Sequence, residues 1–258
     1  DTATTEIYTL SLHDALPICR QGSRISLTEA GKLLLEHCER ILEDYKRLEY
    51  EMHLLHNEYT GGLKLGASTT VAQYVLPPLL ASFIGKFPHV NLSLLNGNSR
   101  EIEAALQEHR IDLGFVEGVF RLPNIKYTTF LKDELVAVVR TGSKLAIGEE
   151  ITPEELLHLP LVLRERGSGT LDVFERALQQ HNIKLSSLQV LMYLGSTESI
   201  KLFLEHTDCL GIVSIRSITR ELYSGQLRVV EIKDMPMLRD FSFAQPQGQE
   251  RSEEHTSE

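Results

Sequence analysis

The chain has 258 residues, enough to bury one sizeable hydrophobic core or two smaller ones. Its 42% hydrophobic and 24% charged residues are typical of a globular protein, and no apolar run approaches the length of a membrane span. The formal net charge of -10 argues against a surface that coats nucleic acid along the whole chain. Three widely spaced cysteines favour a reducing, cytoplasmic setting.

Both ends of the sequence differ in character from the rest. Residues 1–18 lack the charged and apolar regions of a signal peptide and resemble a reading-frame translation of a common sequencing-library adapter. Residues 251–258 resemble the matching adapter, and an adapter would also contribute to the Cys19 codon. We therefore assign 1–19 and 251–258 to adapter-like sequence; a disordered native tail at each end is the alternative.

A long helix is predicted within 28–60, after a basic, short and turn-like segment at 20–27. It opens at Thr28, runs to about Asn57, and gives way to a linker before Gly61. Apolar residues recur along it at alternating spacings of 4 and 3, the seam of a coiled-coil dimer, with charged residues elsewhere. A single amphipathic helix packed on its own domain is the alternative. The seam comprises Leu34, Cys38, Ile41, Tyr45, Leu48, Met52 and Leu55.

Strand and helix signals alternate after the linker, in the βαβ rhythm of an open parallel sheet. We assign 61–138 to a first α/β subdomain. Strands are expected at 63–68, 90–95, 111–116, 124–129 and 134–140, and helices at 70–87 and 99–109.

The same rhythm repeats over 139–234, which we assign to a second subdomain. A strand at 237–244 is expected to return to the first, so that 235–250 completes a truncated subdomain I. Strands are expected at 161–163, 188–193, 211–215 and 227–232, with a short helix opening at 152 and helices at 170–181, 199–206 and 216–223.

Small polar residues gather at the strand-to-helix turns of both subdomains. Unpaired helix amides make such turns suitable for anions or polar ligands. For any one residue an ordinary helix cap is sufficient, whereas a shared polar or anionic ligand explains the whole set better. The set comprises Ser68, Thr69, Thr70, Asn96, Asn98, Ser168, Thr170, Ser196 and Thr197.

Several enzyme and metal chemistries are not supported. The segment 166–170 lacks the lysine and spacing of a phosphate-binding Walker loop, and 66–70 lacks the final glycine of a nucleophile elbow. His53, His56 and the 205–209 segment offer no full tetrahedral ligand set. We predict no catalytic residues and no metal site.

Three motifs in order resemble those of LysR-type transcriptional regulators. Ser26–Gly31, preceded by Arg20 and Arg24, is similar to the segment that follows the winged helix-turn-helix in this family. Gly61–Ala67 resembles the start of the effector domain, and Ile111–Phe115 resembles its third strand. Within the family, Ala67–Pro77 is most similar to regulators of sulfur assimilation and autotrophic carbon fixation.

The resemblance implies an α/β fold, namely a periplasmic-binding-protein-like effector domain of two Rossmann-like subdomains behind a long dimerisation helix. It also implies homodimers, often joined as homotetramers, and a small effector, which the turn chemistry suggests is an oxyanion or carboxylate; no cofactor is expected. The implied effector contacts are Ser68, Thr69, Thr70, Asn96, Asn98, Ser99, Glu117, Arg164, Ser168, Thr170, Ser196 and Thr197.

The winged helix-turn-helix itself is expected to be missing, with 20–27 as a remnant of its wing. Arg20 and Arg24 could contact phosphate but could not read bases, so specific promoter binding is expected of the full-length parent only. RNA polymerase is a further implied partner. The alternatives are a solute-binding protein, which would need an export signal, and an α/β enzyme, for which no coherent catalytic set is visible.

Overall fold

The computed structural model describes residues 17–21, 24–55, 59–118, 121–145 and 148–247, in two compact units that divide between Thr60 and Gly61. In the first unit, β1 (Ile18–Gln21) and β2 (Arg24–Leu27) form an antiparallel pair, followed by α2 (Glu29–Leu55). The expectation of a turn-like segment at 20–27 was therefore wrong, because most of these residues lie in paired strands. The hydroxyl of Thr28 accepts a hydrogen bond from the Gly31 amide at 3.0 Å and so caps the helix.

The predicted long helix is present, and its described apolar seam faces solvent. Ile41 is 65% exposed and Leu48 is 56% exposed, and Leu34, Cys38 and Tyr45 are exposed as well. The side chains of Met52 and Leu55 lie outside the described residues. No helix in the described ranges combines the length and the apolarity that a membrane crossing requires.

The second unit is a mixed α/β fold built on one large sheet. Its elements are β3 (Gly61–Ser68), α3 (Thr69–Tyr74), α4 (Leu76–Lys86), β4 (Val90–Gly97), α5 (Ser99–Gln107), β5 (Leu113–Glu117), β6 (Ile125–Arg140), β7 (Glu150–Ile151), η1 (Glu155–His158), β8 (Pro160–Arg164), α6 (Gly169–Gln180), η2 (Leu185–Ser187), β9 (Gln189–Leu194), α7 (Thr197–His206), β10 (Leu210–Ser214), η3 (Ile215–Ser217), α8 (Thr219–Tyr223), β11 (Leu227–Ile232) and β12 (Met237–Pro246).

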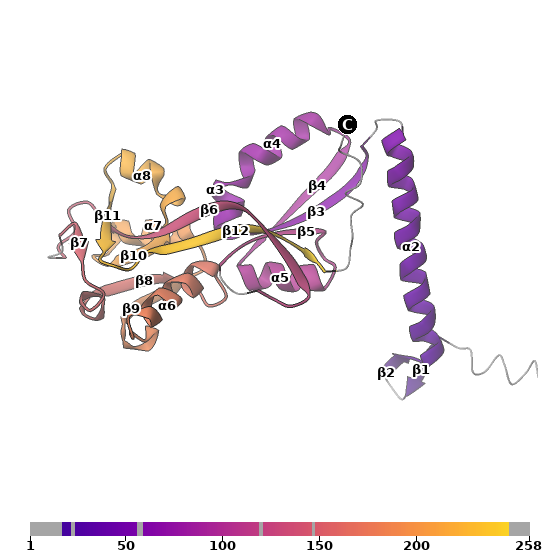
Figure 1. Cartoon of the computed structure of the whole chain (residues 1–258), viewed down its shortest axis with the longest axis horizontal. Helices are drawn as coiled ribbons and strands as arrows, with labels where there is room; N and C mark the ends of the chain where they lie inside the picture. The colour runs from indigo at the N-terminus through magenta and orange to yellow at the C-terminus, as the bar shows by residue number, and fades with distance from the viewer. Residues whose placement is uncertain (1–16, 22–23, 56–58, 119–120, 146–147, 248–258) are drawn as a thin grey trace, which may run out of the picture. The chain divides into compact units, whose positions relative to one another are not determined.

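Two long strands join the two halves of this unit. The strand order is β4-β3-β5-β12-β6-β10-β8-β9, with β11 also paired to β6 and β7. Pairs β3–β4, β3–β5, β8–β9 and β8–β10 are parallel, whereas β12 runs antiparallel to β5 and β6. Figure 1 shows β6 and β12 passing side by side from one half to the other. The expected return of the last strand to the first subdomain is thus confirmed.

We use subdomain I for β3 to β5 with their helices and the adjoining parts of β6 and β12, and subdomain II for β7 to β11 with theirs. Residues 135–140 of β6 already pair with β10 and β11 of subdomain II. The expected division at 138 therefore falls inside a continuous strand, not in a loop between the subdomains.

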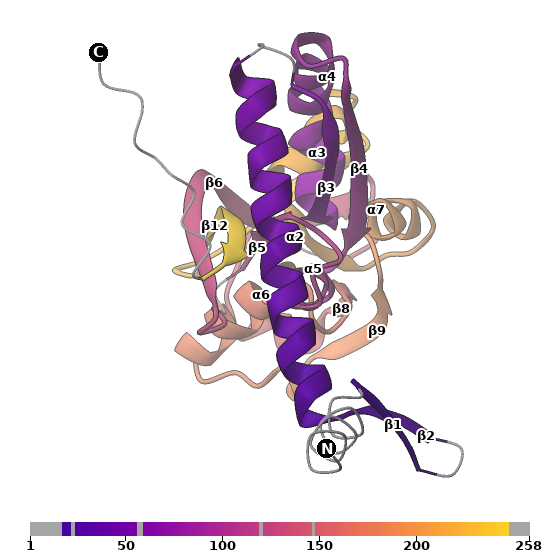
Figure 2. The ribbon, with the colours of Figure 1, turned by 90° about the vertical axis from the view of Figure 1, so that its right-hand side faces the viewer.

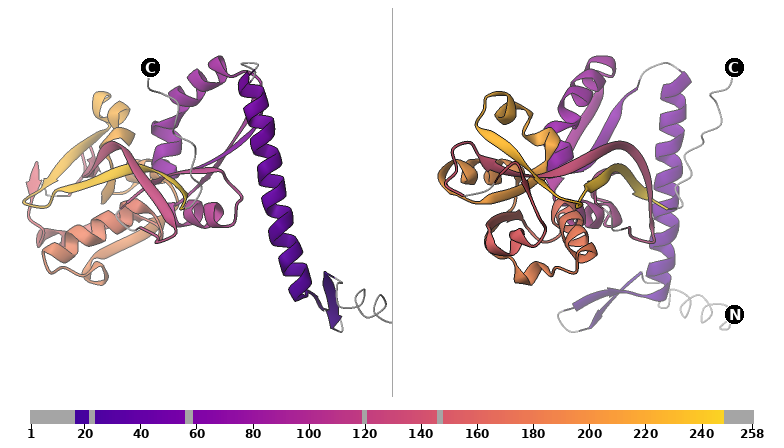
Figure 3. Two further views of the ribbon diagram at one scale, coloured as in Figure 1. Left: turned by 45° about the vertical axis from the view of Figure 1, so that its right-hand side comes forward. Right: turned by 60° about the vertical axis from the view of Figure 1, so that its left-hand side comes forward.

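Helices cover both faces of the sheet in subdomain I, as Figures 1 and 3 show, and Figure 2 shows β3 and β4 side by side next to α3 and α4. Neighbouring residues of β5 point to opposite faces, because side chains alternate along a strand. Phe115 packs with Val71 and Leu76 of α3 and α4, whereas Val116 packs with Ile102 of α5. Burial on both faces explains why β5 is apolar at nearly every position.

Subdomain II repeats this arrangement, with α6 on one face and α7 and α8 on the other (Figure 1). Leu161 and Leu163 of β8 pack in the cluster that contains Phe174 of α6. Val162, between them, packs instead with Ile200 of α7. Phe174 and Ile200 are both fully buried. Each half is therefore a three-layer sandwich of helix, sheet and helix, and the two share β6 and β12.

Three sequence predictions about elements were wrong. The helix expected at 70–87 is two helices separated at Val75, where Pro77 lies in the first turn of α4 and fixes a new helix start. The strands expected at 124–129 and 134–140 are one strand, β6. The helix expected at 216–223 is a 3₁₀ turn, η3, followed by the short α8.

The two subdomains meet through their backbones at Gly169, the first residue of α6. A Cβ atom built on Gly169 would lie 2.2 Å from the carbonyl oxygen of Glu117, the last residue of β5. Only a residue without a Cβ permits this approach, because the obstructing atom is backbone and cannot rotate away.

We expect Gly169→Ala to destabilise the protein by about 1–3 kcal/mol, the usual cost of overpacking a close contact. Gly85→Ala is the matched control, since nothing lies within 4 Å of a Cβ at this helical position and alanine favours the helix by about 0.5–1 kcal/mol. Urea unfolding of both variants measures the difference. Equal stability of the two variants would contradict the backbone contact.

Candidate functional site

The turns after four parallel strands meet around a hollow between the subdomains. Its volume is about 310 Å³, in the range of sites for small molecules. We call it the inter-subdomain hollow. It is lined by Thr69, Gln73, Asn96, Gly97, Asn98 and Glu101 from subdomain I and by Glu165, Gly195 and Ser196 from subdomain II.

A fully buried arginine lies beside this hollow and bonds two of its lining residues, Thr69 and Glu165. Arg164, the last residue of β8, has a side chain with 0% exposure. Its guanidinium donates at 3.3 Å to the hydroxyl of Thr69 in subdomain I and at 3.5 Å to that of Thr197 in subdomain II. Its remaining bonds go to the carboxylate of Glu165, from Nε at 2.8 Å and from Nη2 at 3.0 Å. The cation is thus neutralised by one carboxylate and held by hydroxyls from both subdomains.

A second buried cluster lies where β6 and β12 cross. Arg239 of β12 donates from Nε to Asp133 at 2.7 Å and pairs with Glu117 at 3.2 Å, and all three side chains are at most 1% exposed. Its Nη1 also donates to the hydroxyl of Thr170 at 3.0 Å. On the other side, the hydroxyl of Thr70 donates to Glu117 at 3.2 Å. Side chains of both subdomains therefore compensate the charges of this structural cluster, in which Arg239 Nη2 and Glu117 Oε2 meet as an ion pair and form no hydrogen bond among the described residues.

The residues predicted from the sequence separate into three groups. Thr69, Asn96, Asn98 and Ser196 line the inter-subdomain hollow, and Arg164 and Thr197 lie buried beside it. The other six do not line the hollow. Thr70, Glu117 and Thr170 belong to the Arg239 cluster, Ser99 bonds the Glu117 carbonyl, Ser168 caps α6, and Ser68 is buried with no hydrogen-bond partner among the described residues and forms no side-chain cap.

Five lining residues were not named singly in the sequence prediction: Gln73, Gly97, Glu101, Glu165 and Gly195. Two of them, Gly97 and Glu165, lie in turns expected to contact the effector. Two others had a visible signal. Gln73 follows Thr69 by four positions and so shares its helix face. Glu101 follows Asn98 by three, the spacing of a capping box, and both bonds of that box are present.

A cluster of polar side chains, which we call the latch, also joins the subdomains near the hollow. It consists of Tyr74, Glu198, Lys201 and Glu221. The Tyr74 hydroxyl in α3 donates a hydrogen bond to the Glu198 carboxylate in α7. Lys201, with a side chain 9% exposed, pairs with Glu198 at 2.8 Å and with Glu221 at 2.7 Å. Burial and the bond to Glu198 raise the pKa of Tyr74 far above its usual range. The phenol therefore stays protonated and remains a donor at physiological pH.

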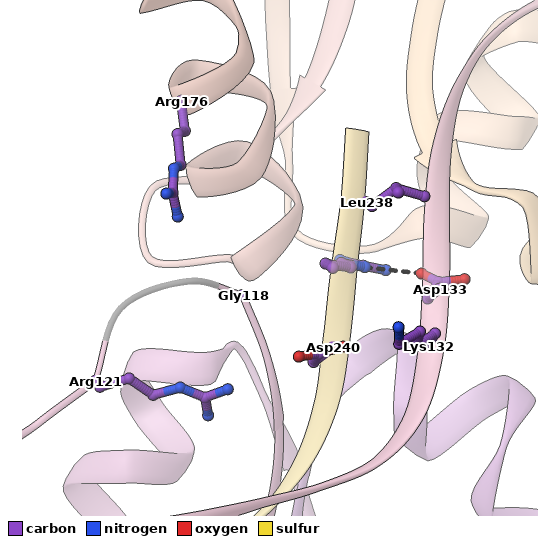
Figure 4. A pocket seen from close by; sticks show the side chains of 8 residues that line it. Gly118, Arg121, Lys132, Asp133, Arg176, Leu238 and Asp240 are labelled. Atoms are coloured by element: carbon purple, nitrogen blue, oxygen red, sulfur yellow. Dashed lines mark hydrogen bonds and ion pairs between the residues drawn. The ribbon is translucent and has the colours of Figure 1, made fainter. Parts of the chain in front are cut away.

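A further hollow of about 380 Å³ lies beside the β6–β12 crossing (Figure 4). The Asp133–Arg239 pair lies in its wall, so these two charges compensate each other. Figure 4 shows Arg176 and Arg121 on either side of Gly118, without a common point toward which both extend. This arrangement does not form a convergent anion site.

Two α/β subdomains joined by crossing strands, with polar turns facing a hollow between them, define a two-lobed domain for binding small molecules. Comparison with known protein families identifies the family to which this domain belongs. The family described as "LysR substrate binding domain" matches residues 56–256, and the chain belongs to the LysR-type transcriptional regulators. The expectation from the sequence motifs is confirmed.

The relatives are regulators. The HTH-type transcriptional regulator YeiE of Escherichia coli is 33% identical over 213 residues, which are 83% of this chain and 70% of YeiE. The RuBisCO operon transcriptional regulator of Acidithiobacillus ferrooxidans is 29% identical over 227 residues, 88% of this chain and 72% of that protein. These relatives disfavour the solute-binding protein and the enzyme as alternatives.

Among solved structures, the CcmR regulatory domain of Synechocystis in complex with 2-PG is similar to this chain. It superposes with a TM-score of 0.66 at 28% identity, over 75% of this chain and 91% of the CcmR domain. The fold class expected from the sequence is thereby confirmed.

The latch predicts a dependence of stability on pH. Burial alone would raise the pKa of Glu198, but hydrogen bonds from Lys201 and Tyr74 outweigh it and hold this pKa below its ordinary value. A carboxyl whose pKa is lower in the folded state stabilises the fold above its unfolded pKa of about 4.3. That stability is lost as the pH falls through the folded pKa.

We therefore expect the stability of Glu198→Gln to fall less steeply than that of the wild type below about pH 4.5, where only the wild type loses this contribution. The difference should be less than about 1 kcal/mol, because the carboxylate is half exposed. Urea unfolding from pH 3 to pH 7 measures it. The exposed Glu205→Gln on the same helix is the control and should follow the wild type; if it changes the slope as much, the latch is not the cause.

Proposed function

We propose that this LysR-type regulator senses a small anionic metabolite in the inter-subdomain hollow. The single observation that carries the proposal is Arg164, a buried guanidinium at the edge of the hollow that contacts both subdomains. A planar fork of donors suits the two oxygens of a carboxylate or oxyanion. The CcmR domain, 28% identical, was solved with 2-PG, which supports a small-molecule ligand for this fold.

Binding between the subdomains would alter their relative position. The hollow takes its walls from both halves, so a ligand that touches both binds one arrangement better than another. That difference in affinity is the only quantity through which a ligand can bias a regulator. We propose that this bias is passed to promoter DNA and, through it, to RNA polymerase in the cytoplasm, in keeping with the relatives' description as transcriptional regulators.

We expect one or more small anions to raise the melting temperature of the chain. At a concentration a hundredfold above Kd, an effector adds about 2.7 kcal/mol of stability. A panel of sulfate, sulfite, phosphate and small carboxylates, followed by thermal unfolding, tests this. Thr69→Ala with Thr197→Ala should abolish the shift, because both hydroxyls hold the guanidinium in place.

Thr128→Ala, an exposed change in β6, is the matched control and should keep the full shift. A folded wild-type chain that responds to none of these anions would refute the anionic effector. A response that survives the double variant would place the ligand elsewhere.

We further propose that α2 pairs with α2 of a second copy, and that such dimers can join as tetramers. The support is the heptad seam, which leaves large apolar side chains such as Ile41 and Leu48 more than half exposed on the single helix. Burying an apolar side chain of this size stabilises an interface by about 1.5–3 kcal/mol. The dimer would also fix the spacing of two DNA-binding units on a promoter.

We expect Ile41→Glu combined with Leu48→Glu to shift the chain to smaller assemblies, because four charges would face one another across the dimer seam. Light scattering coupled to size-exclusion chromatography reports the mass. Leu33→Glu is the matched control, since Leu33 is 58% exposed on the same helix but off the seam. Dissociation by Leu33→Glu alone would show that the seam is assigned to the wrong face.

A further inference from the structure

The carboxylate of Glu165 occupies the donors of Arg164 that an anionic effector would need. We propose that Glu165 is a built-in competitor, which an effector must displace with its own anionic group. The inference rests on the proposed effector role of the inter-subdomain hollow and names the class of ligand. That class is an anion with two oxygens spaced to accept both arms of a guanidinium fork, as carboxylates, phosphates and sulfates have.

Among the partners of Arg164, Glu165 is the one that can leave. Thr69 and Thr197 are buried, at 4% and 1% exposure, and Thr69 also donates to the Gly97 carbonyl at 3.1 Å. The Glu165 side chain is 26% exposed and lines the hollow. Side-chain rotation can therefore move its carboxylate into water while the guanidinium stays in place.

The backbone of Glu165 need not move in this exchange. Its amide donates to the Leu194 carbonyl at 3.2 Å, and its carbonyl accepts from the hydroxyl of Ser168 at 2.8 Å. These bonds hold the main chain on both sides of the Glu165 Cα atom. Displacement is thus a local rotamer change, without rearrangement of the strand or of α6.

The charges around the hollow make displacement necessary for an anion. Its lining contains two carboxylates, Glu101 and Glu165, and no lysine or arginine. Glu101 is fixed by the Asn98 amide at 2.9 Å in the capping box. An anion that entered without moving Glu165 would face two like charges, and no free cation lines this hollow in the described part of the chain.

Exchange also keeps the buried cation paired. Arg164 loses one carboxylate and gains another anion, so no uncompensated charge remains in the interior. Glu165 meanwhile regains its hydration. A neutral ligand cannot replace the ionic bond between Arg164 and Glu165, so Glu165 would stay bound to Arg164. Glu165 therefore excludes neutral ligands from the arginine and lowers the affinity for every anion by the same competition.

The test is the affinity of the full chain and of Glu165→Gln for phosphate, sulfate and acetate, measured by isothermal titration calorimetry. Removing the competing charge should tighten binding of the preferred anion about tenfold, as expected if the free guanidinium is about 10% populated in the wild type. Glu154→Gln is the matched control, because it removes one exposed carboxylate of the same subdomain away from the hollow. It should bind as the wild type does.

Thermal unfolding gives a second measurement that does not depend on the wild-type affinity. Glu165→Gln leaves Arg164 without a charged partner, so the variant should melt lower than Glu154→Gln without anion and recover with it. If Glu165→Gln is too unstable to study, Glu165→Asp shortens the side chain by one methylene, weakens the fork and should show the same tightening in smaller measure.

The outcomes separate the two proposals. Anion binding by the wild type that is equal or weaker in Glu165→Gln would overturn the competitor role and leave the anionic effector standing. Absence of anion binding by both proteins, with both folded, would overturn both. Tighter binding by Glu165→Gln that Thr69→Ala abolishes would support both, because Thr69 holds the guanidinium at this hollow.

Discussion

The pairing of β12 with β6 is the constraint on which the second unit depends. This ladder extends over the whole of β12, and both subdomain sheets continue from it. A buried ion pair between Arg239 and Asp133 fixes its register, because a shift of β12 by one residue would place Arg239 on the face opposite to Asp133. The hollow between the subdomains, and every residue that faces it, takes its geometry from that register.

The sequence predicted most strands and helices because burial on both faces produces apolar runs such as the one around Phe115. The prediction was wrong where a tertiary contact overrides the local sequence pattern. Asp133 is one of the four residues, 130–133, that separated the two predicted strands, and it interrupts no strand because Arg239 neutralises it in the interior. No local pattern can reveal a partner 106 positions away. The break at Val75, by contrast, was visible in the two prolines that follow it.

The candidate site was predictable at the level of turns but not of side chains. Strand-to-helix turns necessarily gather at the carboxyl edge of a parallel sheet, so Thr69, Asn96 and Ser196 could be placed together. Whether a given hydroxyl faces ligand or protein depends on long-range partners, and Thr170 is taken by Arg239 for that reason. The pairing of Glu165 with Arg164 was not predicted, because it depends on the burial of Arg164, which the sequence does not show.

The strand order also affects how readily the folded protein aggregates. In the described sheet, β4 and β9 are the outermost strands of the main path, and Leu95, Met192 and Tyr193 on them are exposed. Edge strands with apolar side chains are templates for uncontrolled pairing between chains. Assembly that covers such edges would protect the protein from aggregation and proteolysis as well as organise it on DNA. A single copy, with both edge strands uncovered, would then be the form most liable to such pairing.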